Sequence, residues 1–197
     1  MGKLRKLAKL GGRVARRVRP SQRSPVVGPR ARPEHRPHSQ SAAQDRPQES
    51  QEVDGVVWSS AQQVQAKLKN PGRPLLVNHW ATWCEGCVDE LPLLAKLHRE
   101  WAEKVDFLGV SWEGFQFERP DVLHHVSIFS KEHGAFWPSW VVKDSPDQLF
   151  EALEMSTHTI PQIWVLSGQG DVIYRLEKVV DEDELGRLEA ALKRVTS

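Results

Sequence analysis

The segment LLVNHWATWCEGCVDELP, residues 75–92, contains both cysteines of the 197-residue chain, Cys84 and Cys87, separated by two residues. Before the cysteines, the apolar run that ends at Trp80 is typical of a buried strand. After them, leucines recur at helical spacing, which predicts an amphipathic helix that Pro92 should kink. Cys84 therefore lies where a buried strand meets the first turn of a helix.

This junction favours a reactive cysteine. The first turn of a helix presents unpaired backbone N–H groups and a partial positive charge, which stabilise the thiolate of Cys84 relative to its thiol. A thiolate is the species that attacks a disulfide. With two intervening residues, the sulfur of Cys87 lies on the same side and within disulfide range, so the pair can open and close as one unit.

Three other interpretations of the cysteine pair compete with this one. Two buried structural cysteines would not need this spacing, and a static disulfide would close a loop too short to constrain much of the unfolded chain. A zinc site would need histidine ligands, because the chain has no further cysteine. The histidines after the first fifty residues are His79, His98, His124, His125, His133 and His158. A redox-active pair is the interpretation that the residues favour.

Short apolar runs and amphipathic stretches alternate from about residue 53 onward. Besides the segment already described, the patterns predict a second buried strand at 105–112 and a hairpin at 161–177. They also predict helices at 59–70, capped by Ser59 or Ser60, at 121–134, at 145–155 and from Asp181 onward. This order predicts an α/β fold with a central mixed sheet flanked by helices and an antiparallel end.

The first fifty residues differ in composition from the rest of the chain. They hold 13 Lys and Arg against 3 Asp and Glu, whereas residues 51–197 hold 14 against 23. Arg, Pro, Ser and Gln dominate, so a disordered basic tail is expected over residues 1–52, ahead of a domain at 53–197. Within the tail, apolar and basic residues alternate at near-helical spacing over 3–19. This suits either an amphipathic helix at an anionic membrane surface or a solvated basic arm.

The sequence shows neither the apolar core of a secretory signal nor a run long enough to span a bilayer. Cytoplasm is therefore the default expectation for localisation. An Arg-rich, acid-poor start also fits an organellar presequence.

The cysteine segment resembles the active-site segment of the thioredoxin superfamily, most closely that of the TlpA/ResA-like thiol-disulfide oxidoreductases. A second stretch, TIPQIWVLSGQGDVIYR at 159–175, is similar to the cis-proline loop and following hairpin of that family. The resemblance covers about residues 53–195 and implies a thioredoxin-like fold. The stretch at 113–150 looks like the extra strand and helix that TlpA-like proteins insert. TlpA-like proteins are usually exported or membrane-tethered, which makes an extracytoplasmic site a further alternative.

The resemblance also implies roles for individual residues. Cys84 would be the exposed nucleophile and Cys87 the resolving thiol. Glu90 occupies the position of an active-site glutamate and would relay the proton of Cys87, on whose helical face it lies; the alternative is a solvated helix residue. Pro161 would be the cis-proline whose loop pairs with an extended substrate.

Further positions would bind substrate or tune the cysteines. Trp83 resembles the tryptophan beside the nucleophile, and Ile160 is the residue type found before the cis-proline of reducing thioredoxins. Glu85 and Gly86 replace the Gly-Pro of thioredoxin. The carboxylate of Glu85 should destabilise the neighbouring thiolate, which favours the disulfide and makes the protein a stronger reductant. Asn78 stands where thioredoxin has a buried aspartate, and it cannot exchange a proton at ordinary pH.

Two groups in the insertion are expected to be ordinary. Six aromatic residues are close together in the sequence and should pack mainly in the core rather than bind a partner. They are Trp112, Phe115, Phe117, Phe136, Trp137 and Trp140. The adjacent His124 and His125 should form an ordinary helix face.

Together these patterns predict an enzyme that reduces disulfides in protein substrates, with electrons from a donor that the sequence does not identify. No metal, organic cofactor or nucleic-acid partner is expected. The alternative is a thioredoxin-like module that docks partners or holds a metal without turnover. A peroxidase is disfavoured because the chain lacks P-x-x-x-T-x-x-C around Cys84.

Overall fold

The computed structural model describes residues 52–115 and 121–197 of the chain. The expected disordered tail, its helix over residues 3–19 and the aromatic residue Phe117 lie outside the described residues. These three expectations stay predictions.

Seven strands of the described residues form one mixed sheet in the order β1-β2-β5-β4-β3-β6-β7. The strands are β1 (Glu52–Val53), β2 (Val56–Ser59), β3 (Leu75–Trp80), β4 (Asp106–Ser111), β5 (Ser139–Val142), β6 (Gln162–Leu166) and β7 (Val172–Leu176). Strands β2, β5, β4 and β3 pair in parallel, whereas the pairs β1–β2, β3–β6 and β6–β7 are antiparallel. The mixed sheet and its terminal hairpin are therefore as the sequence predicts.

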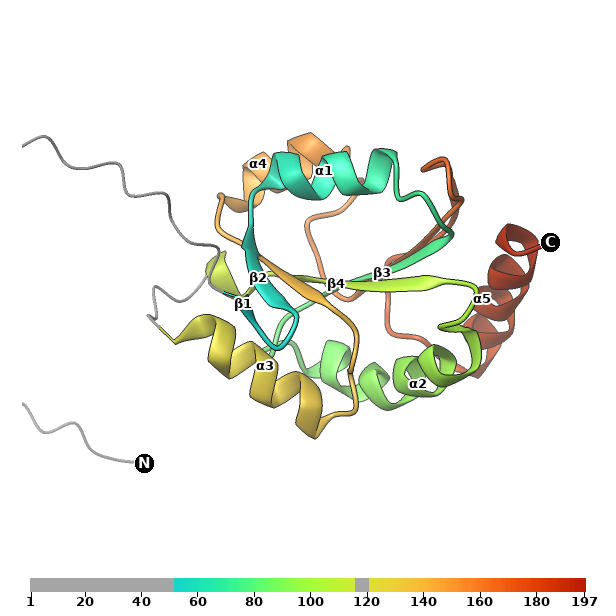
Figure 1. Ribbon diagram of the computed structural model, residues 1–197, viewed down its shortest axis with the longest axis horizontal. Coiled ribbons are helices and arrows are strands. Elements are labelled where there is room, and N and C mark those ends of the chain that lie inside the picture. Colours follow the sequence, from blue (N-terminus) through green and yellow to red (C-terminus); the bar gives the residue numbers. More distant parts are fainter. Residues whose placement is uncertain (1–51, 116–120) are drawn as a thin grey trace, which may run out of the picture. The chain divides into compact units, whose positions relative to one another are not determined.

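Helices cover both faces of the sheet. They are α1 (Ala61–Lys69), α2 (Glu85–Trp101), α3 (Val122–Glu132), α4 (Pro146–Leu153) and α5 (Glu182–Val195), with a short 3₁₀ helix, η1 (Glu113–Phe115). Helices α1 and α4 lie on one face, and α2, α3 and α5 lie on the other (Figure 1). No helix in the described part of the chain is long and apolar enough to cross a membrane.

Local capping explains where the helices begin. Ser60, one of the two expected caps, accepts a hydrogen bond from the backbone N–H of Gln63, whose side chain accepts one from the N–H of Ser60. Such a capping box satisfies two backbone donors that a helix start otherwise leaves unpaired. Asp181 is the N-cap of α5, and its side chain accepts a hydrogen bond from the backbone N–H of Glu184.

Strand β3 lies inside the sheet, and all six of its residues are buried. Because successive strand residues point to opposite faces, Leu76 and Trp80 pack on the side of α2, whereas Leu75 and Val77 pack on the side of α1. The parallel register with β4 pairs Trp80 with Ser111. The segments that follow β3 and β4 therefore leave the sheet at the same edge, where the cysteine pair lies.

The aromatic residues of the insertion do not form one cluster. Trp112 is buried in the core beneath α1 and α4, whereas Trp137 is buried in the core on the other side of the sheet. The expectation of core packing is confirmed for these two. It is wrong for Phe136, which is 70% exposed.

Candidate active site

Cys84 and Cys87 form a disulfide at the start of α2. Cys84 is the N-cap of the helix, and its Sγ accepts a hydrogen bond of 3.2 Å from the backbone N–H of Cys87. Cys84 is half-buried and Cys87 fully buried. The accessible sulfur of the pair therefore belongs to Cys84, at the helix terminus that stabilises a thiolate.

The loop before β6 lies against the disulfide segment. The Ile160–Pro161 peptide bond is cis, as the family resemblance implies. A Cβ atom added at Gly86 would lie 3.7 Å from Pro161 Cδ and 2.7 Å from Val179 Cγ2. Gly86 therefore permits the proline loop and the loop before α5 to approach the cysteines closely.

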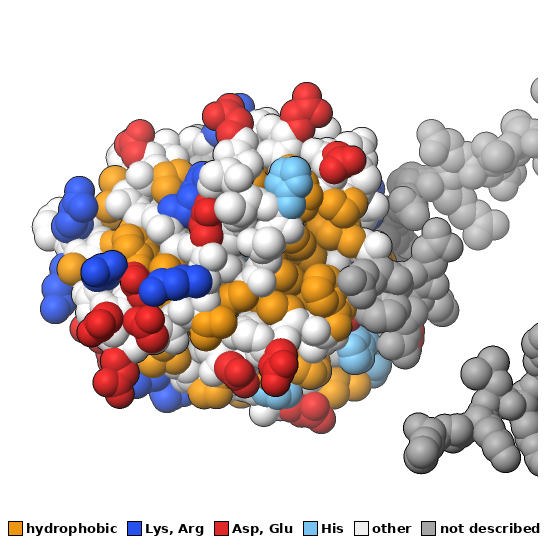
Figure 2. Space-filling view, turned by 180° about the vertical axis from the view of Figure 1, so that it is seen from behind, with side chains coloured by type: hydrophobic (Ala, Val, Ile, Leu, Met, Phe, Trp, Pro, Cys, Tyr) orange, Lys and Arg blue, Asp and Glu red, His pale blue; other side chains and the backbone are white. Residues whose placement is uncertain are grey.

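Partly exposed apolar side chains lie near the cysteine segment. Trp83, next to Cys84 in the chain, is 40% exposed, and Val179, which lies against Gly86, is 41% exposed. Ile160 is half-buried. The space-filling view shows a broad apolar area on one face of the domain, with acidic side chains around it (Figure 2). Exposed apolar area of this kind is typical of a surface that binds another molecule.

Glu90 is buried within the domain, with 2% of its surface exposed. Its Oε2 accepts a hydrogen bond of 3.3 Å from the backbone N–H of Val180, and its Oε1 has no hydrogen-bond partner among the described residues. Burial raises the pKa of this carboxyl from its ordinary value of 4.5 to about 8. The alternative of a solvated helix residue is therefore wrong, and Glu90 is protonated near neutral pH.

The loop between β7 and α5 covers Glu90 and Gly86, and sequence reasoning did not identify it. Val179 lies against Gly86, and Val180 donates its N–H to Glu90. The preceding Lys178 pairs with Glu184 of α5 at 3.2 Å. No sequence motif marks this loop, because its contacts depend on the placement of α5.

The environment of Asn78 differs from that of Glu90. Its Oδ1 accepts a hydrogen bond of 3.1 Å from Trp137 Nε1 in the buried core. The buried strand position before the cysteines therefore holds a neutral amide in a structural contact, and Glu90 supplies a titratable carboxyl on the same side of the sheet.

A second carboxylate contacts the loop that carries the cysteines. Thr82 donates its N–H to Glu113 Oε2 at 3.0 Å and its hydroxyl to Glu113 Oε1 at 2.7 Å. His125 Nε2 lies 3.2 Å from the Thr82 hydroxyl. The expectation of an ordinary helix face is thus wrong for His125, whereas its neighbour His124 is exposed. The only sequence signal for Glu113 was its position directly after a buried strand.

The described residues include no group of three or more His, Cys, Asp or Glu that could hold a metal ion. His79, a candidate zinc ligand, packs with Trp112 and Trp164 in the core beneath α1 and α4, whereas Cys87 belongs to the opposite core. Complete burial lowers the pKa of His79 to about 3, so its ring is neutral. The geometry therefore does not bring His79 to the cysteines.

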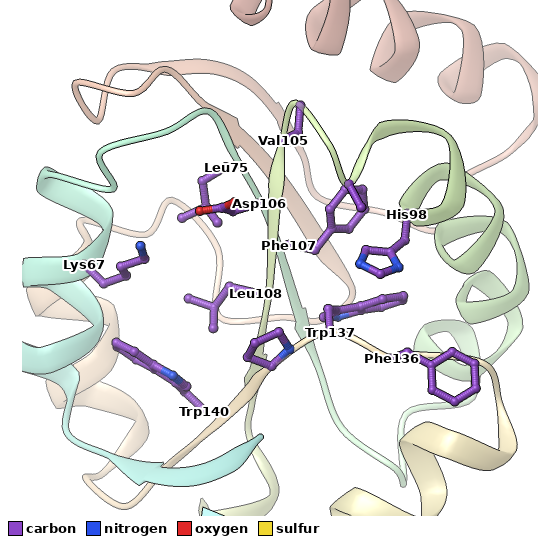
Figure 3. Close-up of a pocket in the computed structure, with 12 residues that line it drawn as sticks. Lys67, Leu75, His98, Val105, Asp106, Phe107, Leu108, Phe136, Trp137 and Trp140 are labelled. Atoms are coloured by element: carbon purple, nitrogen blue, oxygen red, sulfur yellow. The ribbon is translucent and has the colours of Figure 1, made fainter. Parts of the chain in front are cut away.

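One cavity in the described part of the chain lies away from the disulfide. It has a volume of about 320 Å³ and lies at the opposite end of the strands, where β3 and β4 begin. Figure 3 shows Lys67 and Trp140 on one side of β4, and His98 and Trp137 on the other. Attack on a protein disulfide requires an accessible sulfur rather than an enclosed cavity, so we place the site at Cys84.

We predict that Glu90 makes the protein less stable as the pH rises. In the unfolded chain this carboxyl ionises near its ordinary pKa of 4.5, whereas in the folded protein it stays protonated up to about pH 8. The unfolded state therefore releases its proton first, and stability falls across this window. The limiting slope of the free energy of unfolding is about 1.4 kcal/mol per pH unit.

Urea unfolding of the oxidised protein, repeated between about pH 6.5 and pH 8, checks the prediction, because below pH 6.5 the buried neutral His79 adds an opposing rise in stability with pH. Glu90→Gln should remove the decline, whereas Glu100→Gln, at an exposed position of the same helix, should retain it. An equal decline in the Glu90→Gln variant would contradict the assignment.

Comparisons with known proteins agree with this geometry. Residues 54–175, more than half of the chain, match the AhpC/TSA family. The thiol-disulfide oxidoreductase ResA of Bacillus thuringiensis (strain Al Hakam) is 24% identical over 156 residues, which cover 79% of this chain and 83% of that protein. The thiol:disulfide interchange protein DsbE of Haemophilus influenzae is 27% identical over 116 residues, which cover 59% of this chain and 57% of that protein.

A solved structure shares the fold. It is that of a thiol:disulfide interchange protein of the thioredoxin family from Chlorobium tepidum TLS, with a TM-score of 0.50 and 23% identity. The match covers 68% of this chain and 85% of that chain. The thioredoxin-like fold expected from the sequence is confirmed. The chain belongs to the AhpC/TSA family and is similar to the thiol-disulfide oxidoreductase ResA.

Proposed function

We propose that the protein reduces disulfide bonds in protein substrates through Cys84 and Cys87. The observation that carries this proposal is the disulfide at the start of α2, with one accessible and one buried sulfur. The similarity to ResA and DsbE, whose names describe thiol-disulfide oxidation and interchange, supports an oxidoreductase. The finer assignment to substrate reduction is ours.

The proposed reaction has two exchange steps. The thiolate of reduced Cys84 attacks a substrate disulfide and forms a mixed disulfide, and the other substrate sulfur leaves as a thiolate. The thiolate of Cys87 then attacks the sulfur of Cys84, which releases the second substrate sulfur. Two electrons pass from the protein to the substrate, and the disulfide between Cys84 and Cys87 reforms.

Glu90 can move the proton that the buried thiol gains and loses. It lies one helical turn after Cys87, and both side chains are buried. Its pKa of about 8 is close to the ordinary value of a thiol, about 8.5, so proton transfer between the two costs little free energy. In the disulfide form Glu90 holds a proton that the Cys87 thiolate can take up on reduction. The proton returns to Glu90 when Cys87 attacks the mixed disulfide.

The surface around Cys84 suits an extended polypeptide. Trp83 and Ile160 offer apolar contacts, and the loop at Pro161 would provide backbone hydrogen bonds to the substrate. Val179, which lies against Gly86 and is partly exposed, offers a further apolar contact that the sequence did not suggest.

The direction of exchange is proposed from two residues. Glu85 is exposed directly beside Cys84, and a carboxylate there disfavours the thiolate of the reduced form. Ile160 precedes the cis-proline, as in reducing thioredoxins. The compartment and the contact of the basic tail with a membrane surface stay predictions, and the electron donor stays unidentified.

Replacing the resolving cysteine should trap the substrate. We expect Cys87→Ser to lose turnover with insulin as substrate and dithiothreitol as donor. Once this variant has been reduced and dithiothreitol has been removed, it should accumulate a mixed disulfide with insulin, visible as a mass increase on non-reducing gels. Cys84→Ser should lose turnover and trap nothing, because the nucleophile is absent. If both variants still bound partners equally well without any mixed disulfide, the protein would be a docking module instead.

Neutralising the buried glutamate should slow turnover without removing either thiol. We expect Glu90→Gln to lower kcat for insulin reduction by about 10²-fold, the lower range for loss of a general acid–base group. Glu100→Gln is the matched control on the same helix and should keep the parent rate. A Glu90→Gln variant with parental kcat would show that the proton reaches Cys87 by another route.

A further inference from the structure

Two side chains after neighbouring strands meet beside the cysteine pair. Thr82 follows the end of β3 by two residues, and Glu113 follows the end of β4 by two. The backbone N–H of Trp112 donates to the carbonyl of Trp80 at 2.9 Å, which extends the pairing of the two strands by one bond. This parallel pairing places Glu113 where both the N–H and the hydroxyl of Thr82 donate to its carboxylate.

The backbone around Glu113 is fixed against the sheet. Glu113 is 1% exposed, and its N–H donates to Ser111 Oγ at 3.3 Å. A Cβ atom at the next residue, Gly114, would lie 2.2 Å from the carbonyl oxygen of Val142 in β5. The turn therefore packs directly on β5, and Glu113 is an acceptor in a fixed place rather than a mobile surface carboxylate.

A third side chain completes the contact from α3. His125 Nε2 lies 3.2 Å from Thr82 Oγ1 and 3.8 Å from Glu113 Oε1. Because the Thr82 hydroxyl donates its proton to Glu113, its lone pairs are free to accept a hydrogen bond from the histidine ring. Thr82 is thus held from two sides by residues of the insertion.

Thr82 controls how the chain enters the helix that begins after Cys84. The N–H of Cys84 donates to the carbonyl of Ala81 at 3.2 Å, which closes the turn containing Thr82. With Cys84 at the N-cap position, its Sγ accepts a hydrogen bond from the N–H of Cys87. Anchoring Thr82 therefore restricts the position of the sulfur.

We infer that Glu113 and His125 are positioning residues that hold Thr82, and through it place the sulfur of Cys84 at the start of α2. This inference rests on the function proposed above for Cys84. It gives η1 and α3, between β4 and β5, a role in the reactivity of the cysteine pair.

The inference has a measurable consequence in the reduced protein. The thiolate of Cys84 is stabilised by the Cys87 N–H and by the positive end of α2 only when its sulfur stays in place. Loosening Thr82 should therefore lower the fraction of thiolate at neutral pH. Alkylation of Cys84 should then become slower, and its pH profile should move to higher pH.

The experiment measures the rate of Cys84 alkylation by iodoacetamide in the reduced full-length chain, followed by mass spectrometry across a pH series. Thr82→Val keeps the side-chain shape but removes the hydroxyl, and should slow alkylation at neutral pH by about tenfold, as loss of positioning can. His125→Ala should shift the rate and the profile in the same direction.

Two variants serve as controls. Thr82→Ser keeps the hydroxyl that Thr82→Val removes. Its alkylation rate should stay within about twofold of the parent rate, a much smaller change than the tenfold loss expected for Thr82→Val. His124→Ala removes an exposed histidine next to His125 on α3 and should leave the rate unchanged. Parental alkylation by Thr82→Val, or an equal loss in His124→Ala and His125→Ala, would overturn the inference. If Thr82→Val fails to fold, His125→Ala carries the same test, and parental behaviour would overturn the inference there too.

Alkylation needs no protein substrate, so the two proposals can fail separately. If the parent reduces insulin but all variants alkylate at the parental rate, the positioning inference is wrong and the proposed function stands. If the parent has no turnover while Thr82→Val is slow to alkylate, the proposed function is wrong and the positioning of Cys84 stands.

Discussion

The parallel pairing of β3 with β4, in register from Leu75 with Asp106 to Trp80 with Ser111, ends both strands at the same edge of the sheet. The chain leaves β3 through a short turn and enters α2 at Cys84, so the disulfide lies at that edge. The same pairing places Glu113 beside the turn. Antiparallel pairing of β6 with β3 then places the proline loop before β6 next to Gly86. Three segments distant in sequence thus meet at the turn that carries the cysteines because the sheet has this topology.

Two buried glutamates near the cysteines have different surroundings. Glu90 receives one hydrogen bond, from the Val180 N–H, and burial raises its pKa to about 8. Glu113 receives two hydrogen bonds from Thr82 and lies close to His125. The first arrangement suits a group that gains and loses a proton during exchange. The second suits a fixed anchor, because each of its two carboxylate oxygens accepts a hydrogen bond from the loop that it holds.

Sequence patterns within short segments predicted the helices and strands whose formation depends mainly on neighbouring residues. The strand before Cys84, the helix after it and the hairpin after Pro161 each follow from periodicity and turn residues within a short segment. The cis-proline came from the family resemblance. The sequence did not decide whether Glu90 is buried or exposed. Its spacing from Cys87 fixes only the helix face on which it lies, whereas its burial depends on the loop before α5. His125 was misjudged because its partners belong to two other segments. Strands β1 and β2 were not predicted, since their short runs gain stability only from pairing across the sheet.

The equilibrium redox state of Cys84 and Cys87 tests the central claim most directly. It can be measured as a mass shift on thiol alkylation after equilibration in dithiothreitol buffers of known potential. The account predicts a reversible two-electron transition near the value of thioredoxin, about −270 mV, or lower. A transition near −120 mV, the value for the oxidant DsbA, would contradict the proposed direction. The absence of any reversible transition would contradict the assignment of a redox-active pair.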